Sequence, residues 1–162
     1  MNKKLSLWVL LLVSLLAVSL VLGGCQGDKE PQNEGEPVTA SEWEIKIIFN
    51  SEEVVVPIED IRGMIQTTIE VERDETTAYT GVILKDVLAL AGVTEAAVVT
   101  LEADDGYSAS LEDATAIFSD QTILALQIDG EDWDSDSGPI RLVSTEASGK
   151  SWVGQLKLIT VE

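Results

Sequence analysis

Alternation of apolar and polar residues is the dominant pattern of the chain from residue 43 onward. A period of two residues is typical of half-buried strands, and turn-forming residues between such segments indicate hairpins. Asn50-Ser51 and Asp104-Asp105-Gly106 supply turns of this kind, and Asp129-Gly130 is a further two-residue turn signal. The pattern predicts strands over residues 43–49, 53–56, 67–73, 97–103, 107–111, 122–128, 140–144 and 157–161.

The clearest helical pattern has apolar residues at i, i+3, i+4 and i+7, which are Leu84, Val87, Leu88 and Ala91. Gly92 follows, where a glycine commonly ends a helix. We therefore predict a helix over residues 84–91, with shorter helices over 58–64, after Pro57, and over 112–118. Several short strands with two or three short helices indicate an α+β domain that is mostly β, with mixed sheets.

The N-terminal segment has the order of a secretory signal peptide. Lys3 and Lys4 precede an apolar run, which ends in Leu22-Gly23-Gly24-Cys25. This block resembles the bacterial lipobox, in which a diacylglycerol is attached to the cysteine sulfur and the chain is cut just before it. We expect residues 1–24 to be removed and Cys25 to anchor the chain on the extracytoplasmic face of the bacterial cell membrane. An uncleaved spanning helix is the alternative, because about 20 apolar residues can also cross a bilayer.

Residues 25–41 are acidic, contain Pro31 and Pro37 and have almost no large apolar side chain. Such a segment buries too little surface to offset its conformational entropy. We expect it to be a flexible tether between the lipid on Cys25 and a folded domain over residues 42–162. Because Cys25 is the only cysteine, no disulfide within the chain can support that domain.

The charge of the chain narrows the range of partners. The formal net charge is −19, and removal of residues 1–24 would leave 8 basic and 29 acidic side chains, a net charge of −21. A field of this sign repels nucleic acid and anionic lipid surfaces. Nucleic acid is therefore excluded as a partner, and membrane association is expected to come from the lipid itself.

Five short motifs follow one another along the predicted domain. Residues 79–88 read YTGVILKDVL, and residues 138–143 read GPIRLV. The other three are Asp105-Gly106-Tyr107, Leu124-Ala125-Leu126 with Asp129-Gly130, and Trp152-Val153 with Leu156, Ile159 and Val161. Taken in chain order, the five motifs resemble the molybdopterin-binding domain of sulfite oxidase-type oxidoreductases. The patterns of that domain, in the same order, are Y-x-G-V-x-L-x-D-x-L, D-G-Y, L-A followed by N/D-G, G-x-P-x-R-L-V (here one residue shorter) and a closing I-x-V strand. The resemblance implies the fold of that domain.

The resemblance also implies an oxidoreductase that binds molybdenum through a pterin dithiolene and one protein thiolate, a soft ligand suited to the metal. In the family that thiolate lies upstream of the Tyr79 motif, where this chain has residues 69–77 and no cysteine. Lipidation would consume the sulfur of Cys25. The chain resembles a short lipoprotein form of the family that lacks the metal-ligating cysteine, so we predict no catalytic residue and no firmly bound cofactor.

Family members clamp the pterin phosphate with Arg, His and Lys, whereas this chain has no histidine and its predicted domain has three arginines. The resemblance places Arg141 and Lys150 in the segment that approaches the pterin, so these two residues are the candidate cofactor contacts. For Arg141 we favour a structural ion pair, given the many carboxylates. Molybdopterin thus remains an expectation from the resemblance alone.

Asp132, Asp134 and Asp136 alternate in an acidic loop and offer oxygen ligands of the kind that Ca²⁺ prefers. The EF-hand positions for glycine and glutamate, counted from Asp132, hold Ser137 and Val143. The favoured interpretation is a solvated acidic turn between two strands, and weak calcium binding is the alternative.

Three functions of different classes are compatible with these features. The favoured one is a non-catalytic ligand-binding or interaction module on the cell surface, built on a molybdopterin-binding scaffold. The first alternative is a molybdopterin-binding subunit of a redox system, with a redox protein as partner. The second is a cation-dependent acidic surface protein with a role in adhesion.

The anchor prediction is tested at Cys25. Replacement Cys25→Ser should block lipidation, because the serine hydroxyl offers no thiol for the diacylglycerol, and should leave unprocessed precursor or release protein to the medium. Mass spectrometry of the native N-terminus is the measurement. An intact Met1, or cleavage elsewhere with no lipid on Cys25, would contradict the prediction.

Overall fold

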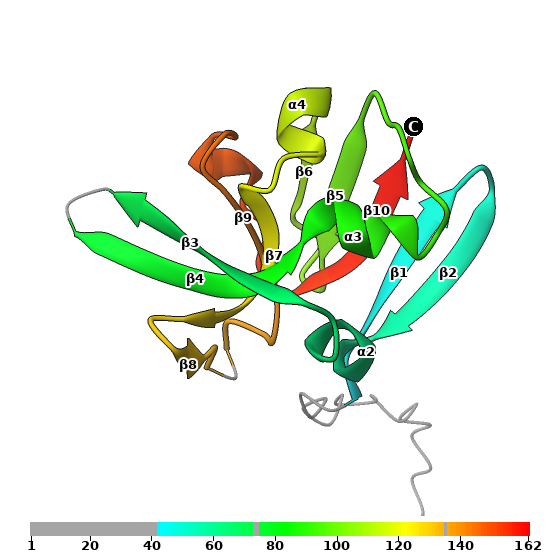
Figure 1. Cartoon of the computed structure of the whole chain (residues 1–162). Helices are drawn as coiled ribbons and strands as arrows, with labels where there is room; N and C mark the ends of the chain where they lie inside the picture. The colour runs from blue at the N-terminus through cyan, green and yellow to red at the C-terminus, as the bar shows by residue number, and fades with distance from the viewer. Residues whose placement is uncertain (1–41, 73–74, 135) are drawn as a thin grey trace, which may run out of the picture. The chain divides into compact units, whose positions relative to one another are not determined.

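Two five-stranded sheets form the framework of the residues that this computed structural model describes, which are 42–72, 75–134 and 136–162 (Figure 1). The first sheet has the order β2 (Glu52–Pro57), β1 (Glu44–Phe49), β10 (Leu156–Val161), β5 (Val99–Ala103) and β6 (Ser108–Leu111). The second has the order β3 (Gln66–Glu72), β4 (Thr76–Ile83), β7 (Thr122–Ile128) and β8 (Glu131–Asp132), with β9 (Arg141–Ser144) also paired to β7. The pairing of β1 with β10 is parallel, and the other pairings are antiparallel. The expected α+β fold with mixed sheets is confirmed.

Two-residue turns close two of the hairpins. Asn50 and Ser51 join β1 to β2 with φ of 52° and 68°, and Asp129 and Gly130 join β7 to β8 with φ of 50° and 84°. Two successive left-handed residues give the backbone twist that such hairpins require. Asp129 also ties β7 to β4, because its Oδ1 accepts a hydrogen bond from the Ala78 N–H at 2.9 Å. These two of the three turn signals in the sequence therefore mark two-residue turns.

The three predicted helices are present in shortened form as α2 (Ile58–Arg62), α3 (Leu84–Ala89) and α4 (Ala114–Ile117). The chain leaves α3 through a turn that ends at Gly92, whose φ is 74°. Asp113 caps α4, since its Oδ1 accepts from the Thr115 N–H at 2.8 Å. A 3₁₀ turn, η2 (Gly149–Ser151), has no counterpart among the predicted elements.

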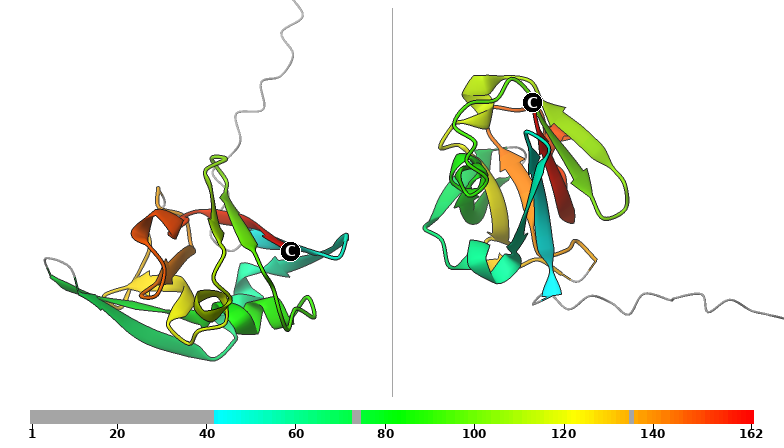
Figure 2. Two further views of the ribbon diagram at one scale, coloured as in Figure 1. Left: turned by 90° about the horizontal axis from the view of Figure 1, so that it is seen from above. Right: turned by 90° about the vertical axis from the view of Figure 1, so that its right-hand side faces the viewer.

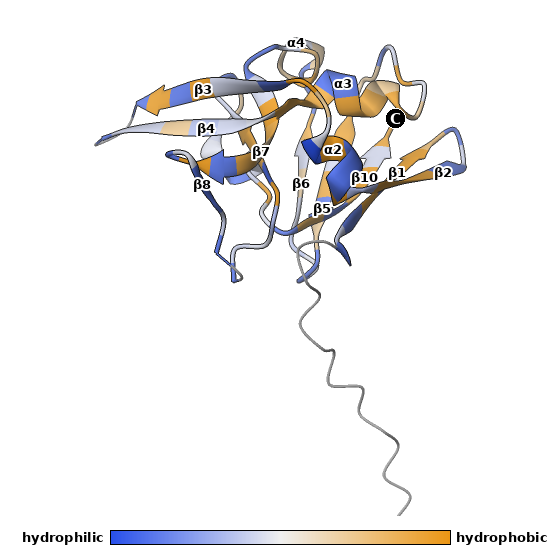
Figure 3. Ribbon diagram, turned by 60° about the horizontal axis from the view of Figure 1, so that its bottom comes forward, coloured by the Kyte–Doolittle hydropathy of each residue, from blue (hydrophilic) through white to orange (hydrophobic). Residues whose placement is uncertain are grey.

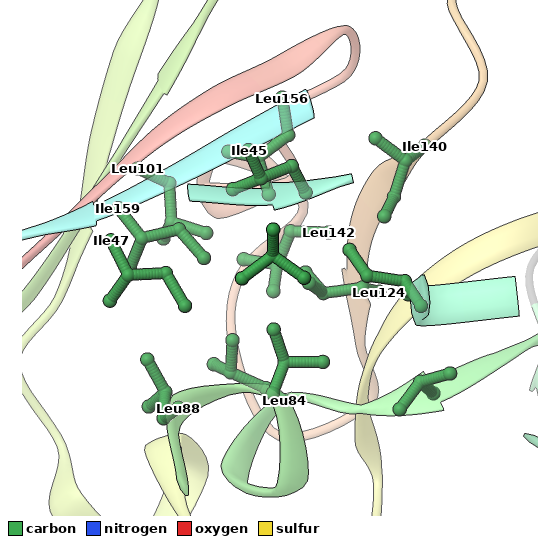
Figure 4. Packing of buried hydrophobic residues seen from close by; sticks show 14 of the residues in the cluster. Ile45, Ile47, Leu84, Leu88, Leu101, Leu124, Ile140, Leu142, Leu156 and Ile159 are labelled. Carbon is green, nitrogen blue, oxygen red and sulfur yellow. The ribbon is translucent and has the colours of Figure 1, made fainter. Parts of the chain in front are cut away.

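The main core lies between the two sheets and α3 (Figure 4). Leu84 and Leu88 of α3 point toward side chains of both sheets, and each is fully buried, as the helical period predicted. The other largest fully buried side chains come from all parts of the domain: Ile45, Ile47, Ile58, Ile61, Leu101, Ile117, Ile123, Leu124, Leu126 and Ile140. Figure 3 shows the same division in α3, with apolar residues on one side and polar residues on the other.

Strand β4 is the main element that the sequence pattern did not predict. Its residues are mostly threonines and other residues of intermediate burial, and Gly81 interrupts them. A glycine inside a strand commonly marks a bulge or a close backbone approach. Here it marks both, because the register of β4 against β7 shifts between Thr80 and Gly81, and a Cβ at Gly81 would lie 2.0 Å from the Leu124 carbonyl oxygen.

The predicted signal peptide, Cys25 and the tether lie outside the described residues. The start of the domain at residue 42 therefore stays a prediction. Within the described part of the chain, no helix is long and apolar enough to cross a membrane. The left view of Figure 2 shows the β3–β4 hairpin extending away from the strands of the first sheet.

Leu88→Ala should lower the free energy of unfolding by about 2–5 kcal/mol, because it leaves a cavity in the main core. Lys85→Ala is the matched control on the outer face of α3. Lys85 is paired with Asp120 at 2.5 Å, which raises the pKa of Lys85, but the two side chains are 37% and 70% exposed. Such surface pairs contribute little. Urea unfolding measures both variants, and equal losses would show that the helix phase is wrong.

Gly81→Ala should destabilise the domain by about 3 kcal/mol or more, since the new methyl group collides with the backbone of β7 and not with a movable side chain. Gly63→Ala is the control, because a Cβ there meets its nearest atom, the Asp60 carbonyl oxygen, at 3.4 Å. Thermal unfolding of the two variants is the measurement. A tolerated Gly81→Ala would mean that β4 and β7 do not approach so closely.

Candidate functional site

A second apolar cluster covers the face of the β3–β4–β7 sheet that points away from the main core. Side chains alternate between the two faces of a strand, so Leu124 of β7 enters the main core while Ile123 and Ala125 point to the other side. We call this group the outer-face cluster. It comprises the buried residues Ile69, Ile123, Ala125 and Val143, with Val71, Tyr79, Ile83, Trp133 and Trp152 packed against them.

Three aromatic rings form the exposed side of the outer-face cluster. The Trp133 Nε1–H donates to the Ala125 carbonyl at 3.1 Å, and the Trp152 Nε1–H donates to the Ser144 carbonyl at 3.1 Å. Tyr79 lies near both rings, stacked with Trp133 at a centroid distance of 6.1 Å and edge-on to Trp152 at 5.6 Å. Offset and edge-on pairs are the favoured arrangements of aromatic side chains, so the rings are fixed over the sheet by backbone hydrogen bonds and by one another.

Arg141 completes this group with a positive charge. Its guanidinium Cζ lies 4.8 Å from the centroid of the Trp133 ring, a cation–π arrangement. The Nε atom is buried and has no hydrogen-bond partner among the described residues. The ion pairs of the described chain join Lys46 to Glu53, Arg62 to Asp132 and Lys85 to Asp120. The structural ion pair that we favoured for Arg141 is thus absent there.

Tight backbone packing holds Arg141 in this position. Arg141 forms an isolated antiparallel bridge with Gly154, and a Cβ on Gly154 would lie 3.1 Å from both Nε and Nη2 of the arginine. The next residue, Gln155, has a φ of 49° and donates from Nε2 to the Asp136 carbonyl at 2.5 Å. Left-handed conformations of residues other than glycine store strain and gather at functional sites. Sequence reasoning missed Gly154 and Gln155, because neither belongs to a recognisable local motif.

Lys150, the second candidate contact, lies in a different environment. It is exposed in η2, and its ammonium group forms no ion pair within the described chain. Its carbonyl oxygen accepts a hydrogen bond from the Tyr107 hydroxyl at 2.7 Å. The Asp-Gly-Tyr motif therefore fixes the backbone of η2 and leaves the Lys150 side chain in solvent, so Arg141 alone is built into the aromatic group.

The three alternating aspartates do not converge. Asp132 accepts from Gln127 Nε2 at 2.9 Å and pairs with Arg62 at 3.5 Å, and Asp134 accepts from the Ser137 N–H at 2.7 Å. Hydrogen bonds from Ser137 hold the pKa of Asp134 below its usual range. In the described ranges no three His, Cys, Asp or Glu side chains are grouped to hold a metal ion. The calcium alternative gains no support from this geometry.

The position implied for the molybdenum thiolate offers no soft ligand. In the stretch from residue 69 to residue 77, Ile69 is buried in the outer-face cluster and Val71 packs against it. The only cysteine of the chain, Cys25, lies outside the predicted domain. The family resemblance of the sequence implied a thiolate ligand here, a soft donor suited to such a metal. The donor set of this domain therefore does not fit the metal.

Solved structures include 29 chains that match this one. One is the sulfane dehydrogenase SoxCD from Paracoccus pantotrophus, with a TM-score of 0.65 and 21% sequence identity. The match covers 76% of this chain and 39% of that chain, so this protein spans well under half the length of that relative. At this identity the likeness establishes the fold. Among curated proteins no match is found.

The family model of the oxidoreductase molybdopterin-binding domain matches residues 35–162, which includes the whole described structure. The match agrees with the order of motifs in the sequence and with the arrangement of the two sheets. The chain belongs to the oxidoreductase molybdopterin-binding domain family.

Proposed function

We propose that this protein is an exported lipoprotein whose molybdopterin-binding-type domain serves as a non-catalytic ligand-binding or interaction module. The observation that carries the proposal is the mismatch between scaffold and metal. The scaffold is that of the family, yet the stretch in which the family places its thiolate has apolar residues such as Ile69 and Val71 in the outer-face cluster. A fold does not determine an activity, and the residues of the site do.

The energetics of cofactor retention support the same proposal. Without the thiolate, a molybdenum cofactor would be held by contacts to the pterin and its phosphate alone. A hydrogen bond to a charged group is worth about 1.5–3 kcal/mol, and about 1.4 kcal/mol corresponds to tenfold in affinity. Loss of two or three such contacts therefore weakens binding by several orders of magnitude. Among the described residues, Arg141 is the half-buried cation that lies against the aromatic rings of the outer-face cluster.

A pterin-binding subunit of a redox system is the second candidate function. One observation favours it: the buried Nε of Arg141 has no partner among the described residues, and a guanidinium in this state suits an anionic ligand. Such a subunit would need a partner protein that supplies the missing metal chemistry. The first candidate predicts that the native protein contains no pterin, and the second predicts that it contains pterin.

Protein purified from a molybdopterin-producing host should therefore contain no stoichiometric molybdenum and no pterin fluorescence. The reason is the absence of a cysteine, and hence of a thiolate ligand, from residues 42–162. Metal analysis by mass spectrometry and fluorescence of an acid extract are the measurements. Near-stoichiometric molybdenum would overturn the proposal, and pterin without metal would favour the second candidate.

Arg141→Ala provides the matched variant for the same preparation. If the proposal holds, the variant changes thermal stability through the lost contact with Trp133 and leaves the absence of cofactor unchanged. Lys150→Ala, at an exposed residue of η2, is the control and should affect neither property. Loss of bound pterin in Arg141→Ala alone would identify Arg141 as a cofactor contact.

A further inference from the structure

Strand β3 presents a long unpaired backbone edge. In the described sheet it pairs with β4 alone, and all seven of its residues are in continuous register from Gln66 opposite Val82 to Glu72 opposite Thr76. Figure 1 and the left view of Figure 2 show β3 on the border of an arm that extends beyond the strands of the other sheet. Every second N–H and C=O group along this edge points outward from the sheet.

Most of the devices that usually protect such an edge are absent from β3. Natural edge strands are kept short, or carry proline, bulges or lysine. Of the other edge strands, β6 has four residues, β8 has two, and β2 ends in Pro57. Strand β3 contains no proline, no glycine and no break in register. The charges on its exposed side are the one feature that restricts what can pair with it.

Polar and apolar residues follow one another along β3 (Figure 3), and its two faces therefore differ in chemistry. Thr68, Glu70 and Glu72 are exposed on one face, and neither glutamate forms an ion pair within the described chain. Ile69 and Val71 lie on the other face, in the outer-face cluster. An added strand would place alternate side chains beside these two rows. Basic residues would match the glutamates, and apolar residues would extend the outer-face cluster.

A second observation at the start of this edge indicates an apolar partner. Ile65 directly precedes β3 and is 89% exposed, the highest value among the large apolar side chains of the described residues. Ile65 is separated from Ile69 and Val71 by an even number of positions, as residues on one face of a strand are. A strand that covers β3 can therefore also cover Ile65. An isolated exposed isoleucine needs no explanation, but its position in line with this row adds to the apolar side of the edge.

We propose that the edge from Ile65 to Glu72 is a docking site for an extended segment of a partner protein, which adds a strand to β3 and has basic and apolar residues in alternation. A second copy of this chain is a poor occupant, because pairing two β3 strands would bring Glu70 and Glu72 close to like charges in a chain of net charge −19. The docking site is independent of the cofactor question, since neither Arg141 nor a metal takes part.

The test uses the purified full chain and a short synthetic peptide of alternating lysine and valine. The peptide should bind, and hydrogen–deuterium exchange of the β3 amides should slow in its presence, because a new ladder protects the edge. E70K/E72K should weaken binding at least tenfold, and Ile65→Ser should weaken it without lowering the melting temperature. E52K on the edge of β2 is the matched control and should leave binding unchanged.

A form of the peptide that is N-methylated at every backbone amide separates strand addition from simple charge attraction, since it keeps the lysine charges and has no backbone N–H to donate. It should not bind. Equal binding of the N-methylated peptide, protection at an edge other than β3, or an equal effect of E52K would overturn the proposal. Protection of β3 that rises with protein concentration in the absence of peptide would make a second copy the occupant and would also overturn it.

Discussion

The close approach of β4 to β7 at Gly81 is the contact on which the second sheet depends. Strand β7 is buried on both faces and pairs with β4, β8 and β9, so it connects the main core to the outer-face cluster. The absence of a side chain at Gly81 lets the two backbones meet. The positions of Tyr79 on β4 and of Arg141 on β9 follow from this pairing, because each strand is placed by its register against β7.

Local patterns predicted most of the fold, and long-range contacts decided the rest. The helical phase of Leu84 and Leu88 and the turn at Asp129-Gly130 depend on neighbouring residues and were predicted correctly. Strand β4 was missed, because the glycine that breaks its pattern has a function only beside β7. The family resemblance indicated Arg141, but its environment could not be read from the sequence. That environment depends on Gly154, which follows it by 13 residues and contacts it across a bridge.

The fold of this protein and the side chains of its candidate site support different conclusions. The arrangement of the sheets and the family match establish the fold, whereas the outer-face cluster consists of apolar and aromatic side chains with Arg141 beside them. Aromatic rings and one guanidinium are suited to recognition by shape and charge. The fold alone therefore does not fix the activity of this domain, because activity depends on the residues of the site.

Trp43 has a mechanical consequence in the lipid-anchored form of the protein that we propose. Its indole N–H donates to the Leu156 carbonyl at 2.8 Å, its own carbonyl accepts from the Ile58 N–H, and the Lys157 ammonium lies 3.6 Å from the ring centroid. Trp43, which directly precedes β1, is thus bound to β10 and to the first residue of α2. Because β1 lies between β2 and β10, a pull on its N-terminal end would load the hydrogen bonds to both neighbouring strands in shear.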